Sequence, residues 1–231
     1  MIRELIMHIL GERKDPRWGN LRRLTPISRT FGYDRGTPVD RYYIERFLRE
    51  RAADIRGRVL EVGGRDYTQK FGGTEVTQSD VLHAVSGNPP ATLVGDLATG
   101  AGIPQEAFDC LILTQTLHVI YDVPSAIAHA HVALKPRGVL LATLPGISQI
   151  SRYDMDRWGD YWRFTSLSAA RLFAEVFTQE NVAVETYGNV LAAVAFLHGV
   201  AAQELQQAEL DYCDPDYQLL LVVRAVKEAQ R

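Results

Sequence analysis

Two segments of the sequence, FDCLILT at 108–114 and GVLLATL at 138–144, are apolar almost throughout. A strand with one solvated face alternates apolar and polar residues, whereas a strand covered on both faces carries apolar residues without interruption. Other strand-like segments alternate with helical patterns, which is typical of a mostly parallel sheet between two layers of helices. The sequence therefore predicts an α/β fold in the form of a Rossmann-like three-layer sandwich.

The chain has enough strand and helix segments for one large domain of this type. The expected strands are 58–62, 74–79, 92–94, 108–114, 138–144, 181–187 and 217–226. The expected helices are one that begins at Thr37 and Pro38 and ends at Gly57, and later ones at 124–135, 165–177 and 190–207. Threonine is a good N-cap, and proline is favoured at the first helical position. We predict an N-terminal arm or lid at 1–36 and a single domain at 37–231.

Composition excludes several classes of partner. The 25 basic and 28 acidic residues leave a formal net charge of −3, which does not suit a broad phosphate-binding surface. The two cysteines, Cys110 and Cys213, form neither a zinc spacing nor a disulfide framework, and this fits a reducing cytoplasm. Charged residues interrupt the apolar residues of 1–14, and no stretch is long enough to span a bilayer. We expect a cytoplasmic protein with no nucleic-acid partner and no integral membrane segment.

A glycine pair follows the first expected strand, in VLEVGGRDYT at 59–68. A dinucleotide-binding turn needs G-x-G-x-x-G here, because its third glycine lets the helix pack tightly and aim its N-terminus at a pyrophosphate. This chain has Arg65 and Thr68 at the second and third glycine positions, and Asp66 would face the phosphates with like charge. A P-loop is absent as well. The sequence therefore disfavours a nicotinamide-dependent oxidoreductase.

Three acids lie in or after the first three expected strands. Glu61 lies within the first strand, Asp80 follows nineteen positions later at the end of the second, and Asp96 sixteen further at the end of the third. A carboxylate can accept hydrogens from both hydroxyls of a ribose, and Asp96 suits an amine hydrogen of an adenine ring. Gly63 and Gly64 clear the backbone beside them of side chains. Together these residues indicate a ligand with a ribose and an adenine but no phosphate.

Five segments resemble motifs of the class I S-adenosylmethionine-dependent methyltransferases: VLEVGG, QSD, VGDL, FDCLILTQTLHVI and LKPRGVLLATLPG. The resemblance implies a seven-stranded sheet whose last strand, at 217–226, is antiparallel. It also implies S-adenosylmethionine as cofactor and S-adenosylhomocysteine as product. Arg65 is a departure, since the family often has a second glycine there. The implied cofactor-binding residues are Glu61, Gly63, Gly64, Asp80, Val81, Asp96, Leu97, Thr114 and Gln115.

Two loops at the carboxyl ends of the expected strands are candidates for binding the molecule to be methylated. The first, RTFGYDRGTPVDRYY at 29–43, can fold over the cofactor as a lid. The second, SRYDMDRWGDYWR at 151–163, sets aromatic rings beside charges, which suits a sugar or another polar ring. The alternative for each is a surface loop or a seal at a helix edge. The expected substrate-binding residues are Tyr33, Arg35, Tyr42, Trp158 and Tyr161.

His118 is the candidate general base, because it follows the fourth strand, at the edge of the sheet where donor and acceptor must meet. Asp34 and His83 are the reserve candidates. The structural alternative is that His118 only bonds a neighbouring carbonyl. The residues after the fourth strand, at 114–116, offer no carboxylate for metal-assisted catalysis, so we predict no catalytic metal.

The function that these observations favour is methylation of oxygen on a small polar molecule or glycan. The lid and the W-x-x-Y-W pattern at 158–162 resemble bacterial methyltransferases of sugar and secondary-metabolite pathways. The alternative is a partner or regulatory subunit that binds the nucleoside cofactor without turnover, and Arg65 is the residue that supports it. The sequence does not predict the oligomeric state.

Overall fold

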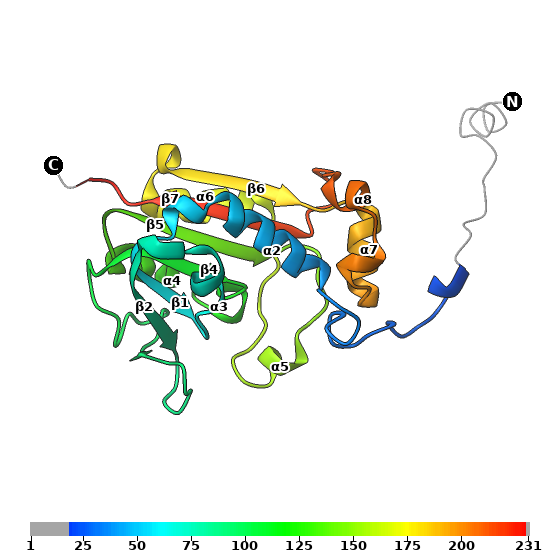
Figure 1. Cartoon of the computed structure of the whole chain (residues 1–231), viewed down its shortest axis with the longest axis horizontal. Coiled ribbons are helices and arrows are strands. Elements are labelled where there is room, and N and C mark those ends of the chain that lie inside the picture. Colours follow the sequence, from blue (N-terminus) through cyan, green and yellow to red (C-terminus); the bar gives the residue numbers. More distant parts are fainter. Residues whose placement is uncertain (1–18, 230–231) are drawn as a thin grey trace, which may run out of the picture.

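The computed structural model describes residues 19–229, which fold around one seven-stranded sheet (Figure 1). The strands are β1 (Gly57–Val62), β2 (Val76–His83), β3 (Leu93–Val94), β4 (Phe108–Thr114), β5 (Leu134–Pro145), β6 (Val182–Tyr187) and β7 (Leu220–Val226). Their order is β3-β2-β1-β4-β5-β7-β6. The pairs among β1 to β5 are parallel, and β7 runs antiparallel to both β5 and β6. The predicted mostly parallel sheet with an antiparallel last strand is confirmed.

Helices cover both faces of the sheet. They are α2 (Val39–Glu50), α3 (Asp66–Phe71), α4 (Val123–Ala133), α5 (Arg152–Met155), α6 (Ser166–Phe177), α7 (Val190–His198) and α8 (Gln207–Asp211). α4 and α6 bury Ile127 and Phe173 against one face of the sheet. α2 and α7 bury Phe47 and Phe196 against the other. The predicted three-layer sandwich is therefore confirmed, and none of the helices described here is long and apolar enough to cross a membrane.

Two predicted helices are shorter than expected. α2 begins at Val39, with Pro38 as its N-cap, and ends at Glu50, because a 3₁₀ turn at 52–54 follows it. α7 ends at His198, where Gly199 adopts a left-handed conformation with φ of 68° and stops the helix. The sequence analysis missed α3, since six residues are too few to show a helical periodicity.

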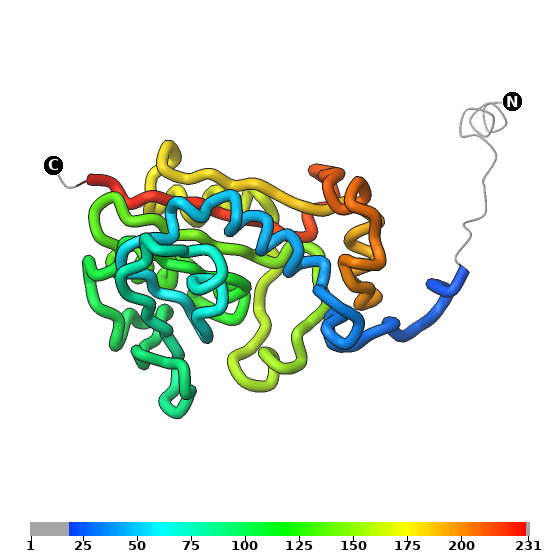
Figure 2. Tube along the Cα trace, in the orientation of Figure 1, coloured from blue at the N-terminus to red at the C-terminus, as the bar shows by residue number. Residues whose placement is uncertain are grey.

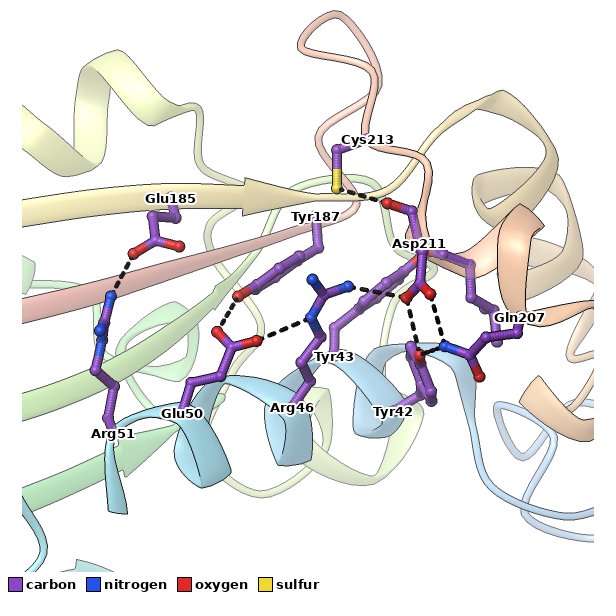
Figure 3. A network of polar contacts seen from close by, with 11 residues as sticks. Tyr42, Tyr43, Arg46, Glu50, Arg51, Glu185, Tyr187, Gln207, Asp211 and Cys213 are labelled. Carbon is purple, nitrogen blue, oxygen red and sulfur yellow. Dashed lines mark hydrogen bonds and ion pairs between the residues drawn. The ribbon is translucent and has the colours of Figure 1, made fainter. Parts of the chain in front are cut away.

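A polar network fixes α2 to β6 and α8 (Figure 3). Arg46 forms an ion pair of 3.0 Å with Asp211, and the Tyr42 hydroxyl donates to the same carboxylate at 3.1 Å. The ring of Tyr43 stacks on that of Tyr187, with centroids 5.4 Å apart. The first turn of α2, which lines a cavity described below, is thus held on a rigid support.

Residues 27–31 of the N-terminal arm pack on α7. The backbone amides of Ile27 and Ser28 donate to the carbonyl of His198 at 2.8 and 3.0 Å, and the ring of Phe31 packs on Phe196. The loop at 146–165 projects from the sheet and returns to it, and it carries α5 (Figure 2). The part of the predicted arm at 1–18 lies outside the described residues.

Candidate active site

Two neighbouring cavities lie at the carboxyl ends of the parallel strands. The strand-end cavity, of about 390 Å³, is lined among others by Gly63, His83, Asp96, Thr114, Trp158 and Tyr161. The arm cavity, of about 560 Å³, is lined among others by Arg29, Tyr33, Arg41, His118, Tyr153 and Arg163. Gln115 and Asp154 line both cavities. A molecule in one cavity therefore borders a molecule in the other at these two side chains.

Gln115 follows directly after β4 and has a left-handed backbone, with φ of 47°. Such a conformation costs free energy in a residue other than glycine, and it persists only where the surroundings hold it. Here the backbone amide of Gln115 donates to the carbonyl of Thr143 at 3.0 Å and to its hydroxyl at 3.1 Å. The chain thus stores strain at the junction of the two cavities.

Glu61 does not line either cavity, contrary to the sequence analysis. Its carboxylate is 3% exposed and accepts from the amides of Tyr67 and Thr68 at 3.2 and 2.8 Å, and from the Thr68 hydroxyl. Burial raises the pKa of Glu61, and the bonds from Thr68 oppose that rise. Glu61 therefore binds the N-terminal turn of α3, which begins abruptly after the glycine pair.

Asp80 also lies away from the strand-end cavity, because β2 continues three residues beyond it to His83. Asp80 pairs with Leu60 in the β1–β2 register, well before the strand end. Its carboxylate accepts from Arg58 Nε at 2.7 Å, from Gln78 at 2.9 Å and from the Thr92 hydroxyl at 3.0 Å. The prediction that Asp80 is the acid at the end of this strand is wrong.

Two further residues that were predicted to bind the cofactor do not line the strand-end cavity. Val81 is a fully buried residue within β2, and Gly64 does not line the strand-end cavity. The residue at the end of β2 is His83, which sequence analysis proposed only as a reserve base. His83 lines the strand-end cavity and does not line the arm cavity. It therefore lies on the wrong side to serve as a base for a molecule in the arm cavity.

The segment after β3 lies at the strand-end cavity. Asp96 and Leu97 line the strand-end cavity, together with Gly63, Thr114 and Gln115. The Asp96 carboxylate accepts from the Ala98 amide at 2.8 Å and from the Thr99 hydroxyl at 3.1 Å. These bonds fix the carboxylate while each oxygen keeps further acceptor capacity.

The loop at 146–165 faces both cavities. Trp158 and Tyr161 line the strand-end cavity, whereas Tyr153 lines the arm cavity. Sequence analysis expected both Trp158 and Tyr161 in the acceptor site, whereas the structure places them at the strand-end cavity. Loop side chains lack a periodic pattern, so nothing in the sequence separates the two sides.

Backbone and side-chain bonds hold this loop in place. The Tyr161 amide donates to the His118 carbonyl at 2.9 Å, and Trp162 Nε1 donates to the Ile120 carbonyl at 3.2 Å. Arg163 binds Asp160 through both terminal nitrogens and donates to the carbonyl of Gln149. A loop tied at these points presents its side chains on a rigid frame.

His118, the predicted general base, lines the arm cavity. It is 6% exposed, and its Nδ1 has no hydrogen-bond partner among the described residues. Burial lowers the pKa of His118, Asp160 opposes this effect, and Arg163 adds to it. The imidazole is therefore neutral at pH 7, which is the form that accepts a proton.

Three residues predicted near the acceptor point elsewhere. Asp34 accepts from Ser28 and Thr30, and Arg35 forms an ion pair with Glu204. Tyr42 belongs to the network with Asp211 that is drawn in Figure 3. None of the three lines either cavity, so the structure gives no support to their predicted roles.

Tyr33 does line the arm cavity. It is hydrogen-bonded to Arg41, a lining residue that the sequence analysis missed. Arg41 Nε donates to the Tyr33 hydroxyl at 2.9 Å, and Arg41 Nη1 donates to the Tyr67 hydroxyl at 3.1 Å. Arg29 and Asp154 are further lining residues that were not predicted. The sequence contains only a weak indication of Arg41. It lies in the first turn of α2, just after Pro38, at a position that is not part of the apolar face of the helix.

Comparison with known proteins adds the family. A family profile described as a methyltransferase domain matches residues 33–185, which is more than half of the chain. A SAM-dependent methyltransferase from Archaeoglobus fulgidus is similar in structure, with a TM-score of 0.53, 10% identity and coverage of 80% of this chain and 94% of that one. A second S-adenosylmethionine-dependent methyltransferase, from Mesorhizobium loti, has a TM-score of 0.51, 15% identity and coverage of 82% and 98%.

The fold by itself does not determine the reaction. The [4+2]-cyclase SpnF has a similar structure, with a TM-score of 0.52, 16% identity and coverage of 85% of this chain and 84% of that one. Identities this low show a shared fold and carry no information about the substrate. The search of curated proteins found no match.

The fold and the strand-end cavity define an α/β protein of the Rossmann-like class with a ligand site at the carboxyl edge of its sheet. The chain belongs to the methyltransferase domain family, and it is a SAM-dependent methyltransferase.

The residues of the strand-end cavity fit S-adenosylmethionine. Gly63 has φ of 81°, and a side chain built there would extend into open space, so the backbone borders the cavity directly. Asp96 supplies an acceptor for hydrogens of a nucleoside, and His83 and Trp158 supply aromatic rings. Gly63, His83, Asp96, Thr114 and Gln115 are the residues that would hold the cofactor.

Proposed function

We propose that this enzyme methylates a hydroxyl oxygen of a small polar molecule or a glycan that binds in the arm cavity. The observation that carries the proposal is the junction of the two cavities at Gln115 and Asp154. A methyl donor in the strand-end cavity and an acceptor in the arm cavity meet there, and positioning of this kind contributes roughly 7–11 kcal/mol to catalysis.

The bound cofactor supplies an activated methyl group on a sulfonium. His118 accepts the proton that the acceptor hydroxyl loses, and its pKa, lowered by burial, keeps it unprotonated near neutral pH. Arg41 lies in the same cavity on a fixed support of two tyrosine hydroxyls, where it can orient polar groups of the acceptor. The loop at 146–165 contributes side chains to both cavities.

The lining of the arm cavity supports a polar acceptor. Arg29, Arg41, Gln149, Ser148 and Ser151 contribute charged or hydrogen-bonding side chains. Tyr33 and Tyr153 add aromatic rings, which suit the apolar face of a sugar. The protein therefore suits a hydroxylated ring better than an apolar one.

One observation favours the alternative of a cofactor-binding subunit without turnover. The end of β2 presents the imidazole of His83 instead of a carboxylate, so the cofactor site departs from the acid that the resemblance implied. Methyl transfer decides between the two functions. We expect transfer of label from S-[methyl-³H]adenosylmethionine to a member of a panel of hydroxylated small molecules and oligosaccharides. Binding of S-adenosylhomocysteine by calorimetry with no transfer to any panel member would favour the subunit.

Replacement of Trp158 by alanine tests which cavity this residue serves. The variant should bind S-adenosylhomocysteine about 5- to 10-fold more weakly, because one aromatic contact is worth roughly 1 kcal/mol. The KM for the acceptor should change less than twofold. Tyr153→Ala, from the opposite side of the same loop, is the matched control and should show the reverse pattern in calorimetry and steady-state kinetics. A raised acceptor KM with normal cofactor affinity in Trp158→Ala would contradict the assignment.

A further inference from the structure

We infer that His83, and not Asp80, binds the ribose of the cofactor, and that it accepts from one of the two ribose hydroxyls through a single ring nitrogen. The inference concerns the nucleoside end of the donor. It requires no assumption about the acceptor or about His118, so it stands or fails separately from the proposed function.

The backbone places His83 at the point where a ribose is bound in folds of this type. The Gly63 amide donates to the Leu82 carbonyl at 2.9 Å, and the Gly95 amide donates to the His83 carbonyl at 3.1 Å. His83 thus lies between the glycine that opens the floor of the cavity and the turn that carries Asp96. It also follows Gly63 by twenty positions, and in nucleotide-binding sheets the ribose is bound by a residue about 20 positions after the glycine turn, at the end of the second strand.

Among the described residues, the His83 ring makes both of its hydrogen bonds at Nδ1, which lies 2.8 Å from the Val85 carbonyl oxygen and 3.3 Å from the Val85 amide nitrogen. The shorter contact is to an acceptor, so the tautomer that satisfies it carries the proton on Nδ1. Nε2 is then a hydrogen-bond acceptor. The ring meets Trp158 edge to face, with centroids 5.7 Å apart, and this contact fixes its orientation at the cavity wall. A hydroxyl of a bound ribose can donate to Nε2.

A carboxylate and a neutral imidazole recognise a ribose differently. A carboxylate has lone pairs for both hydroxyls, whereas Nε2 has one lone pair and accepts from a single hydroxyl. Asp80, by contrast, already accepts from Arg58, Gln78 and Thr92, and it does not line the cavity. His83, at the end of β2, therefore recognises one of the two ribose hydroxyls.

The first test is calorimetry of S-adenosylhomocysteine with three variants. His83→Phe keeps a ring against Trp158 without an acceptor, and it should bind about 5- to 20-fold more weakly, as expected for one lost hydrogen bond. His83→Asn retains an acceptor oxygen and should lose less than His83→Phe. Asp80→Asn is the control and should bind within twofold of the native protein. Equal affinity in His83→Phe, or a loss in Asp80→Asn as large as in His83→Phe, would overturn the inference.

The second test uses the 2′-deoxy and 3′-deoxy forms of S-adenosylhomocysteine as probes. With the native protein, one analogue should bind about tenfold more weakly than the parent compound, and the other within threefold. In His83→Phe this difference between the two analogues should disappear. Equal losses for both analogues with the native protein would indicate a group that accepts from both hydroxyls, and a persistent difference in His83→Phe would place the contact elsewhere. No binding of S-adenosylhomocysteine to the native protein would refute the inference as well.

Discussion

Replacement of His118 by alanine should lower kcat by about 100-fold while leaving the affinity for S-adenosylhomocysteine unchanged. General base catalysis typically contributes 10²–10⁴ in rate, and His118 lies in the arm cavity and not in the cavity that fits the cofactor. The measurement is single-turnover kinetics with labelled donor, so that product release does not conceal the chemical step. Calorimetry checks the cofactor site in the same preparation.

The pH profile provides a second readout for His118. Burial holds the pKa of His118 below its ordinary value of 6.5, since Asp160 offsets only part of the effect. A base must be unprotonated, so the rate of the native enzyme should fall as pH drops through this lowered pKa, below pH 6.5. In His118→Ala this acidic limb should flatten.

His131 offers a matched control for His118. It packs against Phe177, it has a pKa that is likewise lowered by burial, and it lines neither cavity. His131→Ala should therefore change stability but not the shape of the pH profile. A loss of kcat below threefold in His118→Ala, with chemistry rate-limiting, would remove this residue from the mechanism.

The architecture could be predicted because it depends on patterns that run over many residues. The uninterrupted apolar segments at 108–114 and 138–144 placed β4 and β5 at the centre of the sheet, and both are buried there. The strand at 217–226 was expected to be antiparallel, and β7 is. The periodicity that burial imposes on a sequence survives small errors in element boundaries.

The cofactor site could be predicted only in part, since it depends on where single strands end. Asp80 has the residue type of a ribose acid, but Val81 and Leu82 after it are apolar and fully or almost fully buried, which indicates that the strand continues. The apolar residues Val81 and Leu82 are visible in the sequence, but the expected strand was ended at 79, directly before Asp80. A shift of three residues moves an acid from the strand end into the sheet.

The acceptor side could not be predicted residue by residue, because loops have no period. Two neighbours in the arm, Tyr33 and Asp34, are of equal promise in sequence, yet Tyr33 lines the arm cavity and Asp34 bonds to Ser28 and Thr30. Arg41 enters the site through the orientation of α2, which the network with α8 determines. Contacts between distant segments of this kind leave no local trace in a sequence.

The replacement of Asp80 by asparagine should lower the free energy of unfolding by about 2–3 kcal/mol while cofactor affinity stays within twofold. The reason is that Arg58 would lose its partner: the carboxylate is almost fully buried and accepts from Arg58 at 2.7 Å, and removal of one member of such a pair leaves a charge without compensation. Because Arg58 is partly exposed, the loss lies below the full cost of a buried charge. Urea denaturation of the native and variant proteins measures it.

The dependence on pH and a double-mutant cycle separate this ion pair from a general packing effect. Burial alone would raise the pKa of Asp80, but the bonds from Arg58, Thr92 and Gln78 prevail and lower it. A carboxyl whose pKa is lower in the folded than in the unfolded state stabilises the fold above its unfolded pKa, about 3.9, and this stability is lost as pH falls through the folded value. The difference in the free energy of unfolding between the native protein and Asp80→Asn should therefore be constant near neutral pH and shrink below about pH 4.

A double-mutant cycle with Arg58→Met is the second measurement. The losses of unfolding free energy in the two single variants should together exceed the loss in the double variant by about 1–2 kcal/mol, since contacting charges couple. Two outcomes would mean that Asp80 acts through its shape and not through its charge. One is additive losses of unfolding free energy in the cycle, and the other is a difference between the native protein and Asp80→Asn that stays the same in acid.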